Sequence, residues 1–343
     1  MLARCRIALL TLFVVSAVQA QSVPTSVLGK GWGLDHILIG LSDPAVAKET
    51  FGTKLGFSVV HGTRFPAPGL EQAIIQLPPA YIELLWPYQK PTKPVGLSAK
   101  LIAKRIESGG GPAAYNIDVS PASETAAILR GLGLTVTLPP STRISSEGKE
   151  EPGPWQSVTI STEDTYKFLV GVPGGLGVGF GEYRDNPNHL GSDRFRLMRE
   201  GAEREVPDAK RSPGEIHANT ARKLVSVWVA VPNVVEAVKQ SERLGFAPGA
   251  ERQVAILGAR GREVACGIGS IVFWEPVNNT SVLAALIKQC GLGPIGISVG
   301  VADLRTAHQI AEEGTQSKLP IDHNSFLVPG DLAGGTWIEF VQQ

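Results

Sequence analysis

One pattern occurs four times along the chain, and this repetition limits the possible folds more than any other feature. Each copy starts with a short apolar run, passes a polar break and continues with helical spacing. In the first copy, "SVVHGTRF", "EQAIIQLP" and "YIELLWPY" then follow as three strand-like runs between Pro and Gly turns. The copies begin near Leu34, Ala113, Val225 and Gly293. The repeat predicts four βαβββ units and therefore an α+β fold.

The last strand of each unit carries an aromatic residue, any residue and then glutamate. The four copies are Tyr81-Ile82-Glu83, Phe180-Gly181-Glu182, Phe273-Trp274-Glu275 and Trp337-Ile338-Glu339. Side chains alternate between the two faces of a strand, so Ile82 and Leu84 are expected beneath the helix and Glu83 on the opposite face. The same expectation extends to Glu182.

A histidine lies in the first apolar strand. Ile37, Ile39 and Leu41 share the face that packs under the helix, which leaves His36 on the other face. We therefore expect His36 and Glu83 to face one concavity. A histidine in an apolar strand is often only a hydrogen-bonded core residue, but buried carboxylates beside it require a cation, a proton or an arginine. Arg64 is the arginine candidate.

The N-terminal segment predicts the location of the protein, and the charge balance limits its expected partners. Residues 1–20 have two arginines, an apolar run and small residues before Gln21, which predicts a signal peptide and a secreted or periplasmic protein. No membrane contact is expected after cleavage. Lys plus Arg and Asp plus Glu number 32 each, so nothing favours nucleic acid as a partner. Cys266 and Cys290 remain in the mature chain, and their pairing is left open.

The polar stretch between the second and third units divides the chain. We expect one pair of units over residues 21–183, a linker over 184–219 and a second pair over 220–343.

Four stretches resemble a known family: "LDHILIGLSDPAVA", "YIELLWPY", "HANTARKLVSVWVAVPN" and "GGTWIEFV" are similar to glyoxalase-like proteins of the vicinal oxygen chelate superfamily. The resemblance implies that paired units curl into two half-open barrels. It also implies a divalent metal ion, Zn²⁺, Fe²⁺, Mn²⁺ or Ni²⁺, bound by histidine from first strands and glutamate from closing strands.

By position, this resemblance assigns His36, Glu83 and Glu182 as metal ligands, with Glu83 or Glu182 moving a proton. Unit two has Ala114 to Asn116 where a further ligand belongs, so Asn116 or His61 is the replacement candidate. The second pair has Ser226 and Gly296 at the histidine positions, which predicts a metal-free half whose Glu275 and Glu339 are structural.

Two functions remain open from the sequence. The first is a metal-dependent enzyme, of lyase, isomerase or dioxygenase type, acting on a small molecule with neighbouring oxygen atoms. The second is a metal-free protein that binds or sequesters a small molecule in the same concavity. In either case the second pair is a scaffold or a dimerisation half, and a homodimer is possible.

Overall fold

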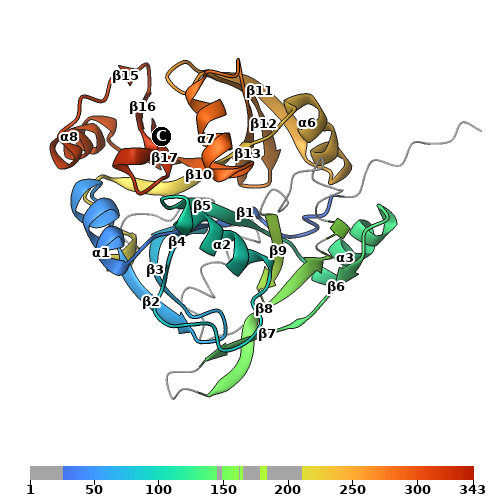
Figure 1. Ribbon diagram of the computed structural model, residues 1–343. Coiled ribbons are helices and arrows are strands. Elements are labelled where there is room, and N and C mark those ends of the chain that lie inside the picture. The colour runs from blue at the N-terminus through green and yellow to red at the C-terminus, as the bar shows by residue number, and fades with distance from the viewer. Residues whose placement is uncertain (1–25, 145–148, 162, 165–177, 184–210) are drawn as a thin grey trace, which may run out of the picture.

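The computed structural model describes residues 26–144, 149–161, 163–164, 178–183 and 211–343. They form two mixed sheets, the first built from residues 33–183 and the second from 221–342, called here the first and second halves (Figure 1). The predicted α+β fold of paired βαβββ units is confirmed. The expected signal peptide and most of the expected linker lie outside the described residues. Within the described residues, no helix combines the length and apolar character needed to cross a membrane.

The first sheet has the strand order β2-β3-β4-β1-β5-β9-β8-β6, with β7 paired to β8. Its strands are β1 (Gly33–Gly40), β2 (Val60–Phe65), β3 (Leu70–Leu77), β4 (Ala80–Pro87), β5 (Gly111–Asp118), β6 (Val136–Thr137), β7 (Pro140–Ile144), β8 (Glu150–Ile160) and β9 (Val178–Tyr183). Its helices are α1 (Pro44–Val46), its π-helical continuation η1 (Ala47–Lys54), α2 (Leu97–Glu107) and α3 (Ala122–Gly131).

The second sheet repeats this arrangement in the order β11-β12-β13-β10-β14-β17-β16-β15. Its strands are β10 (Ala221–Ala230), β11 (Ala247–Val254), β12 (Ala259–Cys266), β13 (Gly269–Pro276), β14 (Gly293–Val301), β15 (Ile321–Asp322), β16 (Ser325–Val328) and β17 (Trp337–Gln342). The remaining helices are η3 (Pro213–Glu215), α6 (Val234–Arg243), α7 (Val282–Cys290), α8 (Leu304–Thr315) and η4 (Gly330–Leu332).

Local signals explain where the unit helices begin and end. Asp43 and Asp303 accept hydrogen bonds from backbone amides in the first turns of α1 and α8, and Asn233 does the same for α6. Gly56 and Gly245 follow η1 and α6 with φ of 72° and 79°, the left-handed conformation in which glycine ends helices.

In both halves the pairing of the strands is the same. β1 lies parallel to β4 and antiparallel to β5, and β10 lies parallel to β13 and antiparallel to β14. The closing strands β9 and β17 complete the second unit of each pair by parallel pairing with β5 and β14. Each half therefore has an approximate two-fold relation between its units.

One hydrophobic core joins the two halves. The helix-side residues of both sheets belong to it, including Ile37 and Tyr115 from the first half and Val227 and Phe340 from the second. The opposite, concave faces of the two sheets point away from this shared core. They are the surfaces on which His36 and the equivalent residues of the second half lie.

Candidate functional site

A buried cluster of polar side chains surrounds His36 on the concave side of the first sheet. Its Nδ1 lies 2.6 Å from Asp35 Oδ2, and its Nε2 lies 2.7 Å from Asn116 Nδ2 and 3.6 Å from Glu83 Oε2. The Tyr81 ring stacks on the imidazole with centroids 4.4 Å apart. His36 and Glu83 are therefore brought together as the sequence indicates, with Asn116 as the third member.

The strand pairing positions these side chains. His36 is opposite Tyr81 in β4 and opposite Asn116 in β5, while Glu83 is opposite the next concave residue of β1, Leu38. A register shift between Leu34 and His36 breaks the regular alternation of β1. Asp35 lies at this irregularity, where its side chain contacts that of the next residue, His36.

The electrostatics of the cluster raise the pKa of both His36 and Glu83. Burial lowers the pKa of His36, but the charge and hydrogen bond of Asp35 and the charge of Glu83 outweigh burial, and the net pKa lies above its ordinary 6.5. Burial raises the pKa of Glu83 above its ordinary 4.5, although His36 partly offsets this effect. The cluster can therefore hold a proton that a bound molecule accepts.

The hydrogen bonds fix how the imidazole is used. When neutral, His36 donates from Nδ1 to Asp35 and leaves the Nε2 lone pair facing Asn116 and Glu83. A carboxylate on the far nitrogen orients a histidine that acts as a base or as a metal ligand. The arrangement can thus move a proton at Nε2 or bind a cation there.

An apolar floor continues the concave face away from the cluster. Helix α2 packs over it, and Ile102 contacts the group of Leu38, Leu85 and Ala114. The site therefore combines a polar end with an apolar wall, which suits a small molecule with a few oxygen atoms.

Glu182 does not join the cluster, and its assignment as a ligand with His36 is corrected. Its carboxylate accepts hydrogen bonds from Ala122 N at 2.9 Å and Ser120 Oγ at 3.1 Å. Pro121, the N-cap residue of α3, provides no side-chain cap, so Glu182 satisfies the first amide of the helix from the closing strand. Glu182 therefore lies on the helix-covered face of the first sheet, and Gly179 lies on the concave face.

The same capping position recurs in the second half. Glu275 accepts a hydrogen bond from Val234 N at 2.7 Å, and Gln342 accepts one from Leu304 N at 3.0 Å. In the first unit Pro44 begins the helix and has no amide hydrogen to satisfy. The aromatic-x-Glu motif thus covers two different positions: Glu83 and Glu339 lie on concave faces, while Glu182 and Glu275 cap helices.

We predict that Glu182→Ala lowers the free energy of unfolding by about 1–2 kcal/mol, because the Ala122 amide loses its acceptor. Chemical denaturation followed by circular dichroism measures this loss. Glu124→Ala, which changes an acidic residue in the first turn of the same helix, is the control and should cost a few tenths of a kcal/mol. Equal losses in both variants would show that capping by Glu182 is not the cause.

Comparison with protein families places the chain. A family model described as a glyoxalase-like domain matches residues 34–245, which is more than half of the chain. The chain belongs to the glyoxalase-like domain family. A search of curated proteins finds no match for this glyoxalase-like protein.

Solved structures support the vicinal oxygen chelate fold. A triple mutant of 4-hydroxymandelate synthase from Streptomyces coelicolor aligns with a TM-score of 0.55 and 11% identity, covering 91% of this chain and 92% of that chain. A hypothetical protein from Staphylococcus aureus aligns with a TM-score of 0.54 and 11% identity, covering 90% and 99%. At these identities the likeness concerns the fold alone.

The residues of this glyoxalase-like protein fit only part of the metal shell that the resemblance implies. The two-fold relation within the first half can be read from the strand pairing. On β1 and β5, His36 pairs with Asn116 and Leu38 pairs with Ala114, so the relation makes His36 equivalent to Ala114 and Leu38 equivalent to Asn116. Leu38 pairs with Glu83 and Asn116 pairs with Gly179, so Glu83 is equivalent to Gly179. Two of four symmetric positions therefore have no ligand side chain. A Cβ on Gly179 would lie 1.9 Å from Asn116 Oδ1, so the amide of Asn116 takes the space of the missing ligand.

Among the described residues, no group of three or more His, Cys, Asp or Glu side chains is arranged to hold a metal ion. The groups that converge are His36, Glu83 and the Asn116 amide.

The other first-half candidates lie on the opposite face. Arg64 Nε donates to Glu71 Oε1 at 2.8 Å, and His61 Nε2 lies 3.6 Å from the same oxygen. Glu71 also accepts a hydrogen bond from Trp86 Nε1 at 3.1 Å. The expectation that Arg64 neutralises the concave carboxylates is therefore wrong, and Asn116, not His61, is the third group at His36.

The concave face of the second half is filled. Trp228 and Trp274 are fully buried there, with rings 5.2 Å apart, and Trp337 belongs to the same cluster. Ser298 donates to Glu339 at 2.6 Å, and Arg252 contacts both oxygens of that carboxylate at 2.7 and 3.0 Å. This internal ion pair agrees with the structural role expected for Glu339.

Cys266 and Cys290 are both free. The possible disulfide between them is not formed.

Proposed function

We propose that this glyoxalase-like protein, exported by residues 1–20, is an enzyme that acts on a small molecule with neighbouring oxygen atoms on the concave face of the first half. The buried contact of His36 with Asp35, Glu83 and Asn116 carries the proposal. Perturbed titratable groups that converge in one concavity are typical of catalytic sites. The resemblance to glyoxalase-like proteins agrees with chemistry on neighbouring oxygen atoms.

Each member of the cluster has a role in proton transfer. His36 Nε2 accepts a proton from a carbon next to a carbonyl, and Asp35 stabilises the imidazolium that forms. Burial raises the pKa of Glu83, and in its protonated form Glu83 donates a hydrogen bond to the oxygen that becomes negative. The Asn116 amide donates a second hydrogen bond to the substrate once it leaves His36. Return of the proton to the former carbonyl carbon, with transfer of the hydroxyl proton to the former carbonyl oxygen, completes the isomerisation of a 2-hydroxy carbonyl compound.

A metal-dependent version of this enzyme is the second candidate. One observation favours it: Asp35 holds Nδ1, so Nε2 can bind a cation once the Asn116 amide turns away, and the 3.6 Å between Nε2 and Glu83 Oε2 suits two ligands on one ion with bonds of about 2 Å. A divalent ion bound there would polarise a substrate carbonyl. A metal-free protein that only binds the small molecule is the remaining alternative.

Deuterium exchange tests the main proposal. The purified chain, incubated in D₂O with a panel of 2-oxo aldehydes, 2-hydroxy ketones and 2-oxo acids, is expected to exchange the C–H next to the carbonyl of at least one compound, as measured by NMR. His36→Gln should slow exchange about 10²–10⁴-fold, because it removes the base. His61→Gln, which changes a histidine on the other face, is the matched control and should leave the rate unchanged.

Metal content separates the candidates. The metal-free mechanism predicts exchange that survives extensive chelation, whereas the second candidate predicts a bound metal by elemental analysis that is lost in His36→Gln and in Glu83→Gln. Saturable binding of a panel compound without exchange by any preparation would contradict both enzymes and leave the binding protein.

A further inference from the structure

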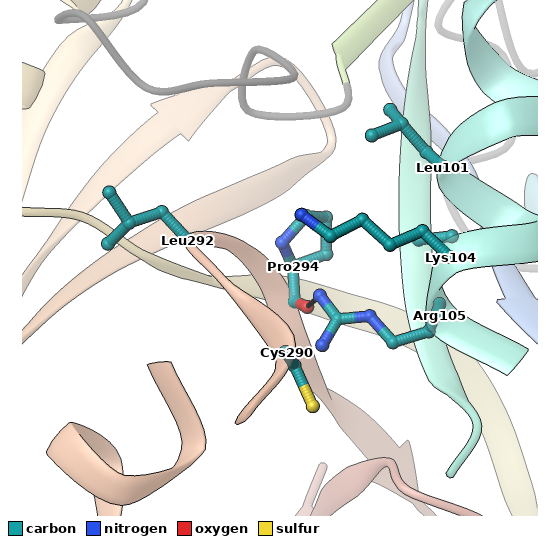
Figure 2. Close-up of a pocket in the computed structure, with 7 residues that line it drawn as sticks. Leu101, Lys104, Arg105, Cys290, Leu292 and Pro294 are labelled. Atoms are coloured by element: carbon teal, nitrogen blue, oxygen red, sulfur yellow. Dashed lines mark hydrogen bonds between the residues drawn. The ribbon is translucent and has the colours of Figure 1, made fainter. Parts of the chain in front are cut away.

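A pocket lies where helix α2 of the first half meets the second half. Leu101, Lys104 and Arg105 approach it from α2, while Cys290 at the end of α7 and Leu292 and Pro294 at the start of β14 approach from the second half (Figure 2). The pocket is partly open to solvent, and Ala113 of β5 completes its lining.

Arg105 is the unusual member of this pocket. Arg105 is only 6% exposed, and its Nη2 donates a hydrogen bond to the Pro294 carbonyl at 2.9 Å. Among the described residues, no carboxylate lies within ion-pair distance of Arg105 or of its neighbour Lys104. The Cys290 thiol also lies within hydrogen-bonding reach of its guanidinium. Burial lowers the pKa of Arg105, and Cys290 partly offsets this effect.

Burial of the Arg105 guanidinium costs free energy unless a negatively charged group lies beside it. Arginine is rarely buried without a partner, because its charge loses hydration that a single carbonyl does not replace. The end of α7 beside the pocket supplies partial negative charge, equivalent to about half a unit at most. Lys104 adds a second positive charge at the same opening (Figure 2). The local charge is therefore positive, in a chain whose overall charge is balanced.

We propose that this pocket is a binding site for an oxyanion group, the carboxylate or phosphate of a small molecule, held by Arg105 and Lys104. Guanidinium groups bind such oxygen atoms with two parallel hydrogen bonds, and lysine adds a point charge. The bound anion would contact both halves, because Arg105 comes from α2 and Cys290 and Pro294 from the second half. The site is separate from His36, and its existence does not depend on the proposed reaction.

Thermal unfolding of the full chain tests the site. Sodium phosphate or sodium acetate replaces sodium chloride in the low millimolar range at constant ionic strength, so that general screening does not change. The unfolding midpoint of the wild type is expected to rise and saturate, since a ligand of the folded state stabilises it. The rise should be smaller in Lys104→Gln and absent in Arg105→Gln. Lys48→Gln, an exposed lysine on η1, is the charge-matched control and should behave as the wild type.

Alkylation of Cys290 is a second measurement that does not require a variant to fold. Cys290 is 9% exposed and lines the pocket, so a bound anion should shield it from iodoacetamide. At about ten times its Kd, the anion should slow alkylation of the wild-type Cys290 peptide about tenfold, as measured by mass spectrometry.

The outcomes assign the anion or overturn the site. Saturable effects of phosphate alone identify a phosphate group, and effects of acetate identify a carboxylate. The proposal is wrong if neither anion stabilises the chain or protects Cys290, or if a folded Arg105→Gln responds as strongly as the wild type.

Discussion

A Gly33→Ala variant is expected to lose at least about 4 kcal/mol of folding stability. Gly33 has φ of 106°, which a residue with a Cβ rarely adopts, and a Cβ there would lie 1.6 Å from the backbone oxygen of Cys266. The Cys266 backbone cannot move away from this clash as a flexible side chain could. Because β1 also carries His36, the site should be disturbed together with the fold. Urea unfolding followed by circular dichroism measures the loss.

Gly131→Ala is the matched control for this prediction. Gly131 is the last residue of α3, and a Cβ there would have no neighbour within 4 Å. Alanine should stabilise the helix by about 0.5–1 kcal/mol. A Gly33→Ala variant as stable as the Gly131→Ala variant would mean that the halves separate easily at this contact.

The contact at Gly33 shows how closely the halves are joined. Gly33 pairs with Gly267 in an isolated bridge, and a Cβ on Gly111 would lie 2.4 Å from the Gly335 carbonyl. Backbone meets backbone at both places, so the halves pack without room for side chains. Together with the shared core, this makes the second half a support for β1 and β5, the strands that carry His36 and Asn116.

The repeat and the alternation of strand faces were sufficient to predict the fold and the meeting of His36 with Glu83. They failed at Glu182 because the aromatic-x-Glu motif gives no information on how a closing strand is aligned with its helix. Glu182 lies one residue past Gly181, the partner of Asp118, and there it meets the amide of Ala122. A sequence signal existed: Pro121 leaves the helix without a side-chain cap, whereas Asp43 caps the first one.

Other members of the site depended on details that sequence patterns do not carry. Asp35 reaches His36 where a register shift interrupts β1. Asn116 reaches it because Gly179 on the neighbouring strand has no side chain. Arg64 pairs with Glu71 because β2 and β3 align them directly, on the face away from His36. Each depends on strand register, which long-range pairing decides.

The second large effect is expected from Trp274→Ala, which should lower the free energy of unfolding by about 3–5 kcal/mol. Trp274 is 0% exposed and packs against Trp228, so its removal leaves a large apolar cavity on the concave face of the second half. Trp274→Phe should cost less, because the indole Nε1 of Trp274 has no hydrogen-bond partner among the described residues. Chemical denaturation of both variants gives the comparison.

Added indole tests whether the concave face of the second half is a filled core or an open pocket. If it is a filled core, millimolar indole should restore part of the stability of Trp274→Ala by occupying the cavity, as apolar cavities bind small apolar molecules. It should leave the wild type unchanged, because Trp228 and Trp274 already occupy the space. A loss below about 1 kcal/mol in Trp274→Ala would instead indicate that the tryptophans line an open pocket. The filled core is the expected result, since the second half has two packed tryptophans and an Arg252–Glu339 pair on the face where the first half has the contact of His36 with Glu83.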